Sequence, residues 1–237
     1  MKNIFNKIFK KIEMTPSLEE ITSKISDENK TILSTYVNPY SIQLLDENII
    51  NKIDNIYVDG ITLVWLLNFT YGFKIKRSSF DLTSHADELF SSSYISNYKV
   101  GLIGGTKNEI KDTVTFFNER YPELNIDFYH SGYFEDDDLK HLISKFKNCD
   151  FIICGMGTPK QEEFMIFLKQ TFPYGKRVFS CGAFFSQTAS KGDYYHPLID
   201  KLNLRWVQRH IESSEVRRRH IIEYPKFLYK FIKNLFS

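Results

Sequence analysis

The chain has 237 residues, enough for one large α/β domain with or without an appendage, and too few for a two-domain enzyme of ordinary size. Apolar residues make up 42% and charged residues 25% of the chain, so a substantial core can form and global disorder is excluded. Three cysteines without a C-x-x-C pair suggest neither a disulfide framework nor a zinc ribbon, and a reducing cytoplasm fits them best. No apolar run reaches membrane-spanning length and no signal-peptide pattern is present, so we expect neither membrane spanning nor secretion.

The net charge of +2 is unevenly distributed along the chain. Residues 1–12 hold four lysines and no acid, and residues 201–237 hold nine Lys or Arg against three Glu, which leaves −8 on the stretch between them. Basic ends of this kind are attracted to anionic lipid headgroups or to nucleic-acid phosphates. Because no nucleic-acid-binding motif accompanies them, we expect an anionic membrane surface and no nucleic acid as partner.

The N-terminal segment, residues 1–29, opens with an amphipathic pattern. Five apolar side chains share one helical face, namely Ile4, Phe5, Ile8, Phe9 and Ile12. The pattern is typical of a short helix that lies in a membrane interface. The alternative is a frayed terminus or a helix packed on its own domain, and the sequence does not favour either.

Residues 30–195 alternate between short apolar runs and segments of helical length. The predicted strands are 31–37, 55–59, 99–103, 125–129, 150–154 and 177–181. The predicted helices between them are 40–52, 60–71, 82–92, 107–120, 136–147 and 159–171. Repeated alternation predicts an α/β, Rossmann-like domain with a mostly parallel sheet and helices on both faces.

Residues 196–237 predict a basic, helical C-terminal appendage, with segments at 198–211, 213–223 and 225–236. In the last of these, one helical face carries Phe227, Leu228, Phe231, Ile232 and Leu235, with lysines alongside. This arrangement suits a membrane surface, and the alternative is a helix that closes the core. Under the membrane hypothesis, truncation before Glu212 leaves a folded core.

Ligands of open α/β sheets bind at the carboxyl ends of the strands, so the residues that follow each strand are the first candidates. Four such places carry Asn38-Pro39, Asp59-Gly60, Gly104-Gly105-Thr106 and the run from Gly155 to Glu162. The last run, GMGTPKQE, combines two glycines with a proline at a helix start, which indicates an anion site at the helix N-terminus. A plain tight turn is the alternative.

Asp59 has two interpretations, a general base held at a cleft and a cap for the next helix, and the residues alone favour the cap. The triplet Asp136-Asp137-Asp138 contains a D-x-D, but it begins a helix, so a solvated first turn accounts for it better than a metal site. The six histidines show no metal-binding spacing, and no metal is expected. The glycines between Gly101 and Gly105 do not complete G-x-G-x-x-G, which gives NAD binding only weak support.

Taken together, these motifs resemble the WecG/TagA/CpsF glycosyltransferase family over roughly residues 30 to 225. The matching residues are Asn38-Pro39, Val58-Asp59-Gly60-Ile61, Arg77, Phe80-Asp81-Leu82, Gly104-Gly105, Tyr121-Pro122, Gly132-Tyr133-Phe134, Gly155 to Glu162 and Arg205-Trp206-Val207-Gln208-Arg209. The resemblance implies an inverting, metal-independent transferase that moves a hexose or an N-acetylhexosamine of the N-acetylmannosamine type from a UDP-sugar to a sugar linked to undecaprenyl diphosphate. It further implies cell-surface polysaccharide synthesis, a peripheral position at the inner face of the cytoplasmic membrane, and no cofactor besides the donor; a homo-oligomer is left open.

The resemblance also assigns residues. Asp59 becomes the base that deprotonates the acceptor hydroxyl, Lys160 and Gln161 hold the UDP pyrophosphate, and Arg77 is a candidate for a diphosphate. The substrate-binding residues so implied are Thr35, Asn38, Arg77, Gly104, Gly105, Tyr133, Gly155, Gly157, Thr158, Pro159, Lys160, Gln161 and Glu162. Those implied at the lipid diphosphate and membrane are Arg209, Arg217, Arg218 and Arg219.

Three places depart from the family pattern. Ser78-Ser79-Phe80 follows Arg77 where Arg-Thr-Gly is common, and Tyr195-His196-Pro197 and Arg205-Trp206 replace R-A-P and E-W. These departures leave the donor sugar and the acceptor open. The alternative functions are a Rossmann-type nucleotide-binding oxidoreductase, for which the glycine fingerprint is incomplete, and a non-catalytic protein that binds a membrane surface.

Overall fold

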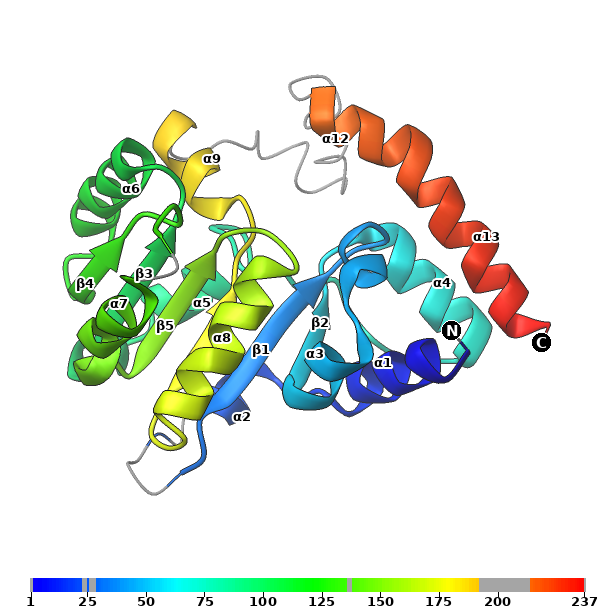
Figure 1. Cartoon of the computed structure of the whole chain (residues 1–237), viewed down its shortest axis with the longest axis horizontal. Helices are drawn as coiled ribbons and strands as arrows, with labels where there is room; N and C mark the ends of the chain where they lie inside the picture. The colour runs from blue at the N-terminus through cyan, green and yellow to red at the C-terminus, as the bar shows by residue number, and fades with distance from the viewer. Residues whose placement is uncertain (1, 23–24, 26–28, 136–137, 192–213, 237) are drawn as a thin grey trace.

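A computed structural model describes residues 2–22, 25, 29–135, 138–191 and 214–236 (Figure 1). Its centre is one six-stranded parallel sheet with the strand order β2-β1-β6-β5-β3-β4. The strands are β1 (Ile32–Val37), β2 (Asn55–Val58), β3 (Lys99–Gly104), β4 (Asn125–His130), β5 (Phe151–Gly155) and β6 (Arg177–Ser180). All six predicted strands are present, each within one or two residues of its predicted bounds, and the α/β, Rossmann-like prediction is confirmed.

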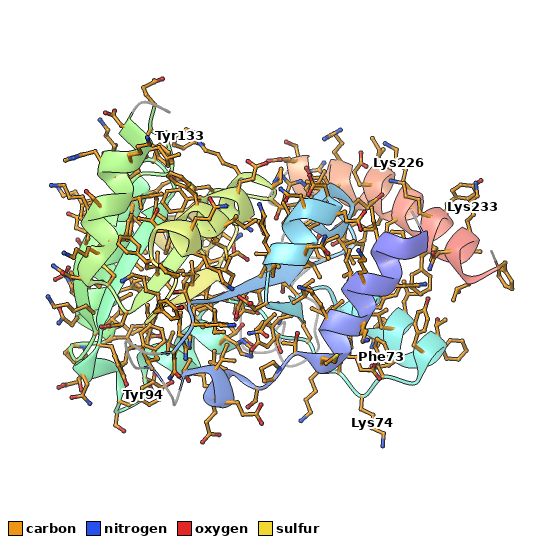
Figure 2. All side chains as sticks on the ribbon, turned by 60° about the horizontal axis from the view of Figure 1, so that its bottom comes forward. Phe73, Lys74, Tyr94, Tyr133, Lys226 and Lys233 are labelled. Carbon is orange, nitrogen blue, oxygen red and sulfur yellow. The ribbon has the colours of Figure 1, made fainter. Side chains whose placement is uncertain are left out.

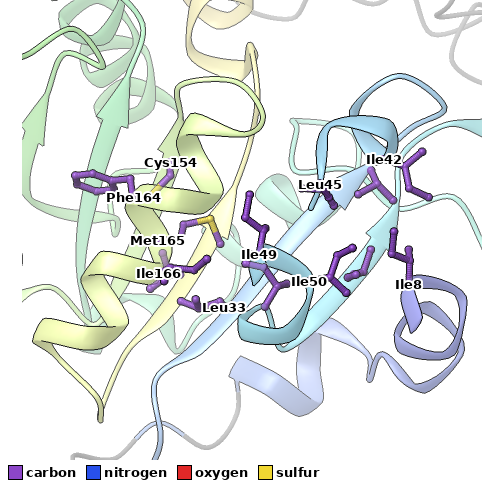
Figure 3. Packing of buried hydrophobic residues seen from close by; sticks show 14 of the residues in the cluster. Ile8, Leu33, Ile42, Leu45, Ile49, Ile50, Cys154, Phe164, Met165 and Ile166 are labelled. Atoms are coloured by element: carbon purple, nitrogen blue, oxygen red, sulfur yellow. The ribbon is translucent and has the colours of Figure 1, made fainter. Parts of the chain in front are cut away.

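The sheet divides the core into two clusters because successive side chains of a strand point to opposite faces. On β5, Ile152 and Cys154 lie in one cluster, and Phe151 and Ile153 lie in the other. Helices α1, α3, α4, α7, α8 and α13 contribute to the first cluster, and α2, α5, α6 and α9 contribute to the second. Figure 3 shows part of the first cluster, where residues of α8 pack near Leu33 of β1. Both faces of the sheet are therefore covered, as predicted.

The helices over the sheet are α1 (Lys2–Met14), α2 (Leu18–Thr22), α3 (Glu47–Lys52), α4 (Ile61–Tyr71), α5 (His85–Phe90), α6 (Lys107–Arg120), α7 (Leu139–Lys145), α8 (Lys160–Thr171) and α9 (Phe184–Lys191). The predicted helix 40–52 is two pieces, a 3₁₀ turn over Ser41–Leu44 and then α3. The break has a local cause, since the Asp46 side chain accepts a hydrogen bond from the Ile49 N–H at 2.8 Å and so caps a new helix.

Helix α1 packs its apolar face into the core rather than presenting it to solvent. Phe5, Ile8, Phe9 and Ile12 are each at most 5% exposed. Lys11 donates a hydrogen bond to the carbonyl of Ile53, which follows α3. Of the two alternatives that the sequence left open, the structure therefore favours a helix packed on its own domain.

The described part of the C-terminal appendage consists of α12 (Ser214–Arg218), a π-helical turn (Arg219–Glu223) and α13 (Tyr224–Leu235). The predicted segment 198–211 lies outside the described residues. On α13, Phe227 and Phe231 are buried against Phe5 and Phe9 of α1. Leu228, Ile232 and Leu235, expected on the same apolar face, are 38–45% exposed. The helix therefore closes the core with one half of its apolar face and leaves the other half in solvent.

In the described part of the chain, no helix combines the length and the apolar character that crossing a bilayer needs. The proposed division at residues 29 and 195 stays a prediction, and the chain between 192 and 213 lies outside the described residues.

Candidate active site

A cavity of about 480 Å³ opens at the carboxyl edge of the sheet. The sequence-predicted site residues that line it are Asn38, Asp59, Gly105, Tyr133, Gly155, Gly157, Thr158, Lys160, Gln161 and Arg219. They come from the ends of β1, β2, β3, β4 and β5 and from the appendage. The cavity lies beyond the carboxyl ends of the parallel strands, where ligands of such sheets bind. It brings together residues up to 181 positions apart in the chain, from Asn38 to Arg219.

The turn from β5 to α8 forms one wall of the cavity. Gly157 has a φ of 76°, which favours glycine, and the Thr158–Pro159 peptide bond is cis. Helix α8 then begins at Lys160, so its first residues Lys160 and Gln161 lie at the cavity. A helix N-terminus offers backbone N–H groups and the positive end of its dipole to an anion.

The ends of β3 and β5 approach each other closely at Gly104 and Gly155, which leaves no room for a side chain at Gly104. A Cβ atom on Gly104 would lie 2.4 Å from the Gly155 carbonyl oxygen. The adjacent Gly105 has a φ of 60°, and it lines the cavity where Gly104 does not. Gly104 is therefore required for the contact between β3 and β5, and Gly105 for the cavity wall.

Asp59 follows β2 and faces the cavity instead of capping the next helix. The N-cap position of α4 is Gly60, and no side chain caps that helix. The Asp59 carboxylate instead pairs with Arg77, whose Nη2 is 2.6 Å from Oδ1 and whose Nε donates to the Asp59 carbonyl at 2.8 Å. Arg77 Nη2 is also 3.7 Å from Asp81. The helix-cap interpretation, which the residues alone favoured, is wrong, because a guanidinium fork holds this carboxylate in place.

Arg77 was expected to hold a diphosphate, yet it is not among the described residues that line the cavity. Its contacts with the Asp59 carbonyl and carboxylate tie the loop after α4 to the end of β2. Because Nε donates to the backbone carbonyl while Nη2 donates to the carboxylate, the guanidinium fixes the direction in which the carboxylate points. The diphosphate role of Arg77 stays a prediction.

Below the cavity lies a buried polar cluster that centres on Glu162, whose side chain is fully buried. Its Oε1 accepts hydrogen bonds from the Thr35 hydroxyl at 2.6 Å, the Gln161 amide at 2.9 Å and the Thr158 hydroxyl at 3.2 Å. Burial raises the pKa of the Glu162 carboxyl, against the effect of these donors. Oε2 has no hydrogen-bond partner among the described residues.

Gln161 connects this cluster to the turn between β6 and α9. Its Oε1 accepts from the Gly182 N–H at 3.2 Å, and its Nε2 donates to Thr158 and Glu162. Ser180 completes the network, with its hydroxyl 2.9 Å from that of Thr35. Thr35 and Glu162, which were predicted to bind substrate, are therefore a buried layer that supports cavity-lining residues.

Lys160 and Tyr133 form the side of the cavity at the end of β4. Lys160 Nζ donates to the Gly132 carbonyl at 3.2 Å and lies 4.9 Å from the centre of the Phe134 ring. Tyr133 is 72% exposed at the rim, and Figure 2 shows its side chain projecting from this end of the molecule. A cation and an exposed aromatic ring thus lie beside the N-terminus of α8.

Of the four arginines predicted in the appendage, the structure places Arg219 at the cavity. Its guanidinium carbon lies 4.3 Å from the centre of the Tyr40 ring, and it pairs with Glu215 one turn earlier. Arg217 and Arg218 are exposed and do not line the cavity, and Arg209 lies outside the described residues. The contact with Tyr40 comes from another part of the chain, and no sequence pattern revealed it.

Sequence reasoning missed one wall of the cavity, the turn between β6 and α9. Ser180, Cys181, Gly182 and Ala183 line the cavity there. The strand 177–181 was predicted, but no site residue was predicted at its carboxyl end, although the same rule applies to it. Because β6 lies between β1 and β5, this turn is at the centre of the edge.

Tyr36 was missed as well, because it precedes the end of β1. Its hydroxyl is 2.7 Å from Nδ1 of the buried His85. Burial lowers the pKa of His85 to about 4, so the imidazole is neutral near pH 7. The contact anchors Tyr36 in the cavity wall against the second core cluster.

No group of three or more His, Cys, Asp or Glu suited to a metal ion occurs within the described ranges. Asp136 and Asp137 of the D-x-D triplet lie outside those ranges, and Asp138 precedes α7 without capping it. The cysteines Cys149, Cys154 and Cys181 are free thiols.

The chain is similar to one known protein family and to individual proteins of known activity. The model of the Glycosyl transferase WecG/TagA/CpsF family matches residues 2–237. A UDP-Gal:alpha-D-GlcNAc-diphosphoundecaprenol beta-1,4-galactosyltransferase of Shigella boydii is 42% identical over 224 residues, which cover 93% of each chain. An N-acetylglucosaminyldiphosphoundecaprenol N-acetyl-beta-D-mannosaminyltransferase of Staphylococcus aureus strain MRSA252 is 33% identical over 152 residues, 62% of this chain and 57% of that protein.

Proposed function

The chain belongs to the WecG/TagA/CpsF glycosyltransferase family, and from this membership we propose that it transfers galactose from UDP-galactose to an N-acetylglucosamine carried by undecaprenyl diphosphate. It is a glycosyltransferase of cell-surface polysaccharide synthesis; the donor and the linkage are the finer part of the proposal. Galactose is favoured over N-acetylmannosamine because the galactosyltransferase relative matches along 93% of the chain, whereas the mannosaminyltransferase relative matches along 62%. Neither an oxidoreductase nor a non-catalytic surface protein fits these relatives.

One observation carries the proposed chemistry, which is the position of Asp59. Its carboxylate lies in the same cavity as Lys160, the start of α8 and Arg219. A base and several groups suited to phosphates therefore meet where a nucleotide sugar and a lipid-linked sugar have to meet.

The reaction that we propose is a single displacement. The acceptor hydroxyl oxygen attacks the anomeric carbon of the donor, and its proton passes to the Asp59 carboxylate. The bond between that carbon and the diphosphate oxygen breaks, and UDP leaves with the electron pair. The α-linked donor sugar thereby becomes β-linked. Arg77 keeps Asp59 in the required direction through its two contacts.

The leaving diphosphate gains negative charge as the bond breaks. Lys160 and the N–H groups at the start of α8 are the groups in the cavity that can stabilise it. We propose that they suffice without a divalent metal ion or a further cofactor. Arg219 is assigned to the diphosphate of the acceptor, because it lines the cavity from the appendage, whereas Lys160 lines it from the start of α8.

The acceptor is a lipid, so the enzyme has to work at a membrane surface. We place it as a peripheral protein at the inner face of the cytoplasmic membrane, held by its basic ends. The excess of cations in residues 1–12 and 201–237 supports this position.

The experiment is a screen of UDP-sugars with the full chain and a short-chain lipid-diphosphate N-acetylglucosamine, with UDP release as the readout. UDP-galactose should give the highest rate, and the product should gain one hexose by mass spectrometry. Release of UDP from UDP-N-acetylmannosamine but not from UDP-galactose would leave the class intact and overturn the donor.

A further inference from the structure

Helix α4 is predominantly apolar, with Thr62, Asn68 and Thr70 as its polar residues, although only one side of it is buried. The sequence Ile61–Tyr71 contains no charged residue. Leu63, Val64 and Leu67 are buried in the first core cluster. On other sides of the helix, Trp65 is 64% exposed and Phe69 is 94% exposed. A helix at a protein–water boundary ordinarily carries polar residues on its outer side, so two large exposed aromatic residues mark a surface that binds something.

The charges around this helix indicate the chemistry of its partner. The stretch from Ile61 to Lys76 contains no acidic residue, and its two cations, Lys74 and Lys76, are exposed. In Figure 2, Lys74 projects from the end of the molecule that α4 shares with α1 and α13. Aromatic residues flanked by lysines, without acids, match the boundary between anionic headgroups and acyl chains, where Trp in particular is enriched.

A second apolar surface adjoins this one. At the end of α4, Tyr71 packs edge-on against Phe231 of α13, with ring centroids 6.2 Å apart. Helix α13 leaves Leu228 and Ile232 exposed, with Lys226 and Lys233 also exposed. Figures 1 and 2 both show α13 and α4 at the same end of the molecule. Two helices with exposed apolar residues and lysines thus share one end.

The position of α4 relative to the cavity is fixed by the chain itself. Asp59 and Gly60 directly precede the helix. Trp65 lies four residues after Ile61, the first residue of the helix, which corresponds to about 6 Å along the helix axis at 1.5 Å per residue. A bilayer that takes up Trp65 and Phe69 would therefore lie next to the carboxylate that has to receive a lipid-linked acceptor.

We propose that the exposed side of α4, with Trp65 and Phe69 as the inserted side chains and Lys74 and Lys76 as the headgroup contacts, docks the enzyme on an anionic bilayer. This inference rests on the proposed function for its link to the acceptor. The occupant is a lipid surface rather than a second copy of the chain, because a self-complementary dimer gains nothing from lysines on both sides without acids to meet them.

The chain offers a direct reporter, since it contains two tryptophans, Trp65 and Trp206. The Trp206→Phe variant leaves Trp65 as the sole indole. We expect its fluorescence to shift to the blue on addition of vesicles of phosphatidylcholine with phosphatidylglycerol, and to be quenched when the lipids carry bromine on their acyl chains. An unshifted and unquenched Trp65 on vesicles that sediment the protein would overturn the proposal.

A second measurement compares two variants in vesicle sedimentation. Trp65→Gln with Phe69→Gln should lower the partition onto these vesicles by at least about tenfold, because two large apolar side chains no longer leave water. The control is Tyr174→Gln, an exposed aromatic residue at 55% on the loop before β6, which should bind as the unchanged protein does. Equal binding of all three proteins contradicts the proposal.

Light scattering in the absence of lipid measures the oligomeric state and so tests whether a second copy of the chain occupies the α4 surface. A dimer that the double substitution converts to a monomer would assign the α4 surface to a second copy and overturn the lipid docking. Transfer to a water-soluble N-acetylglucosamine diphosphate should be the same for the double variant and the unchanged protein. If neither transfers sugar to that acceptor, the proposed function fails, and the fluorescence result still decides the docking.

Discussion

The two walls of the cavity are built in different ways. The wall made by β1, β5, β6 and the start of α8 rests on buried hydrogen bonds among Thr35, Gln161, Glu162 and Ser180. In the wall made by the appendage, Arg219 is held at the cavity by its position over the Tyr40 ring and by its pair with the exposed Glu215. A buried network fixes atoms because every lost bond leaves a desolvated group, whereas an exposed contact leaves room for adjustment. We infer that the first wall holds the nucleotide and the second adapts to the lipid-linked acceptor.

The largest effect expected is that of removing the appendage. Truncation before Glu212 removes Phe227 and Phe231, which are each 1% exposed. Burial of a Phe side chain contributes about 1.5–3 kcal/mol, so the loss of both costs about 3–6 kcal/mol of unfolding free energy, a large part of a typical total. Urea denaturation of the truncated and full chains measures this. A truncated chain of unchanged stability would restore the expectation of an independent core.

Asp59→Asn should lower turnover by about 10²-fold or more, the scale at which a general base contributes, because the amide keeps the shape and cannot take the proton. UDP affinity measured by calorimetry should stay within about twofold, since Asp59 does not belong to the wall that we assign to the nucleotide. Asp138→Asn, an exposed carboxylate before α7, is the matched control. Near-normal turnover of the Asp59 variant would remove the base from the account.

Glu162→Ala should lower the unfolding free energy by about 1–3 kcal/mol and weaken UDP binding, because three donors lose their acceptor in a buried place. Thermal and urea denaturation measure the first effect, and calorimetry the second. Thr115→Ala, an exposed hydroxyl on α6, serves as the control. A variant with unchanged UDP affinity would mean that the buried layer does not position the nucleotide wall.

The same carboxyl predicts a dependence on pH. Burial raises the pKa of Glu162 above its ordinary value of 4.5, so the folded state favours the protonated form. Its contribution is fully present below pH 4.5 and is lost as the pH rises through the folded pKa. Relative to Glu162→Gln, the unfolding free energy of the unchanged protein should therefore fall as the pH rises from 4.5. A difference that grows in the opposite direction would show that the carboxylate is held ionised.

Arg219→Ala should lower transfer to the lipid-linked acceptor by about tenfold, the scale of one charge-assisted hydrogen bond, and leave UDP affinity unchanged. Arg217→Ala, on the exposed side of α12, is the internal control and should transfer normally. Equal effects of the two substitutions would mean that the appendage acts through its net charge rather than through the contact with Tyr40.

The smallest expected effect is that of metal removal. With EDTA present, turnover should stay within about twofold, because the groups assigned to the phosphates are Lys, Arg and N–H donors. Abolition by EDTA with rescue by Mn²⁺ would return the triplet around Asp136 to consideration.

The comparison of the two walls also explains what the sequence could predict. The strands, the glycine turns and the motif from Gly155 to Glu162 are local patterns with known geometry, so their meeting at one edge followed from the parallel sheet. Tertiary contacts are different. That Arg77 pairs with Asp59 depends on a loop 18 residues away, and no periodicity encodes it. Arg219, and not Arg217, packs over the ring of Tyr40, which lies in another part of the chain.

The amphipathic ends show the same limit. The pattern identified the apolar faces of α1 and α13, but hydrophobic periodicity is the same for a helix that packs on protein and for one that lies on lipid. Phe5 and Phe227 are buried against each other, a pairing between opposite ends of the chain. The exposed aromatic residues of α4 escaped notice because a continuous apolar run is ordinarily read as a buried helix.

The anomeric configuration of the product tests the central claim most directly. The full chain would be incubated with UDP-galactose and a short-chain lipid-diphosphate N-acetylglucosamine, and the disaccharide examined by proton NMR. A single displacement with Asp59 as base predicts a β-linked galactose, seen as a large coupling between the first two ring protons. An α-linked product, with its small coupling, would require a different mechanism in this cavity and would contradict the account.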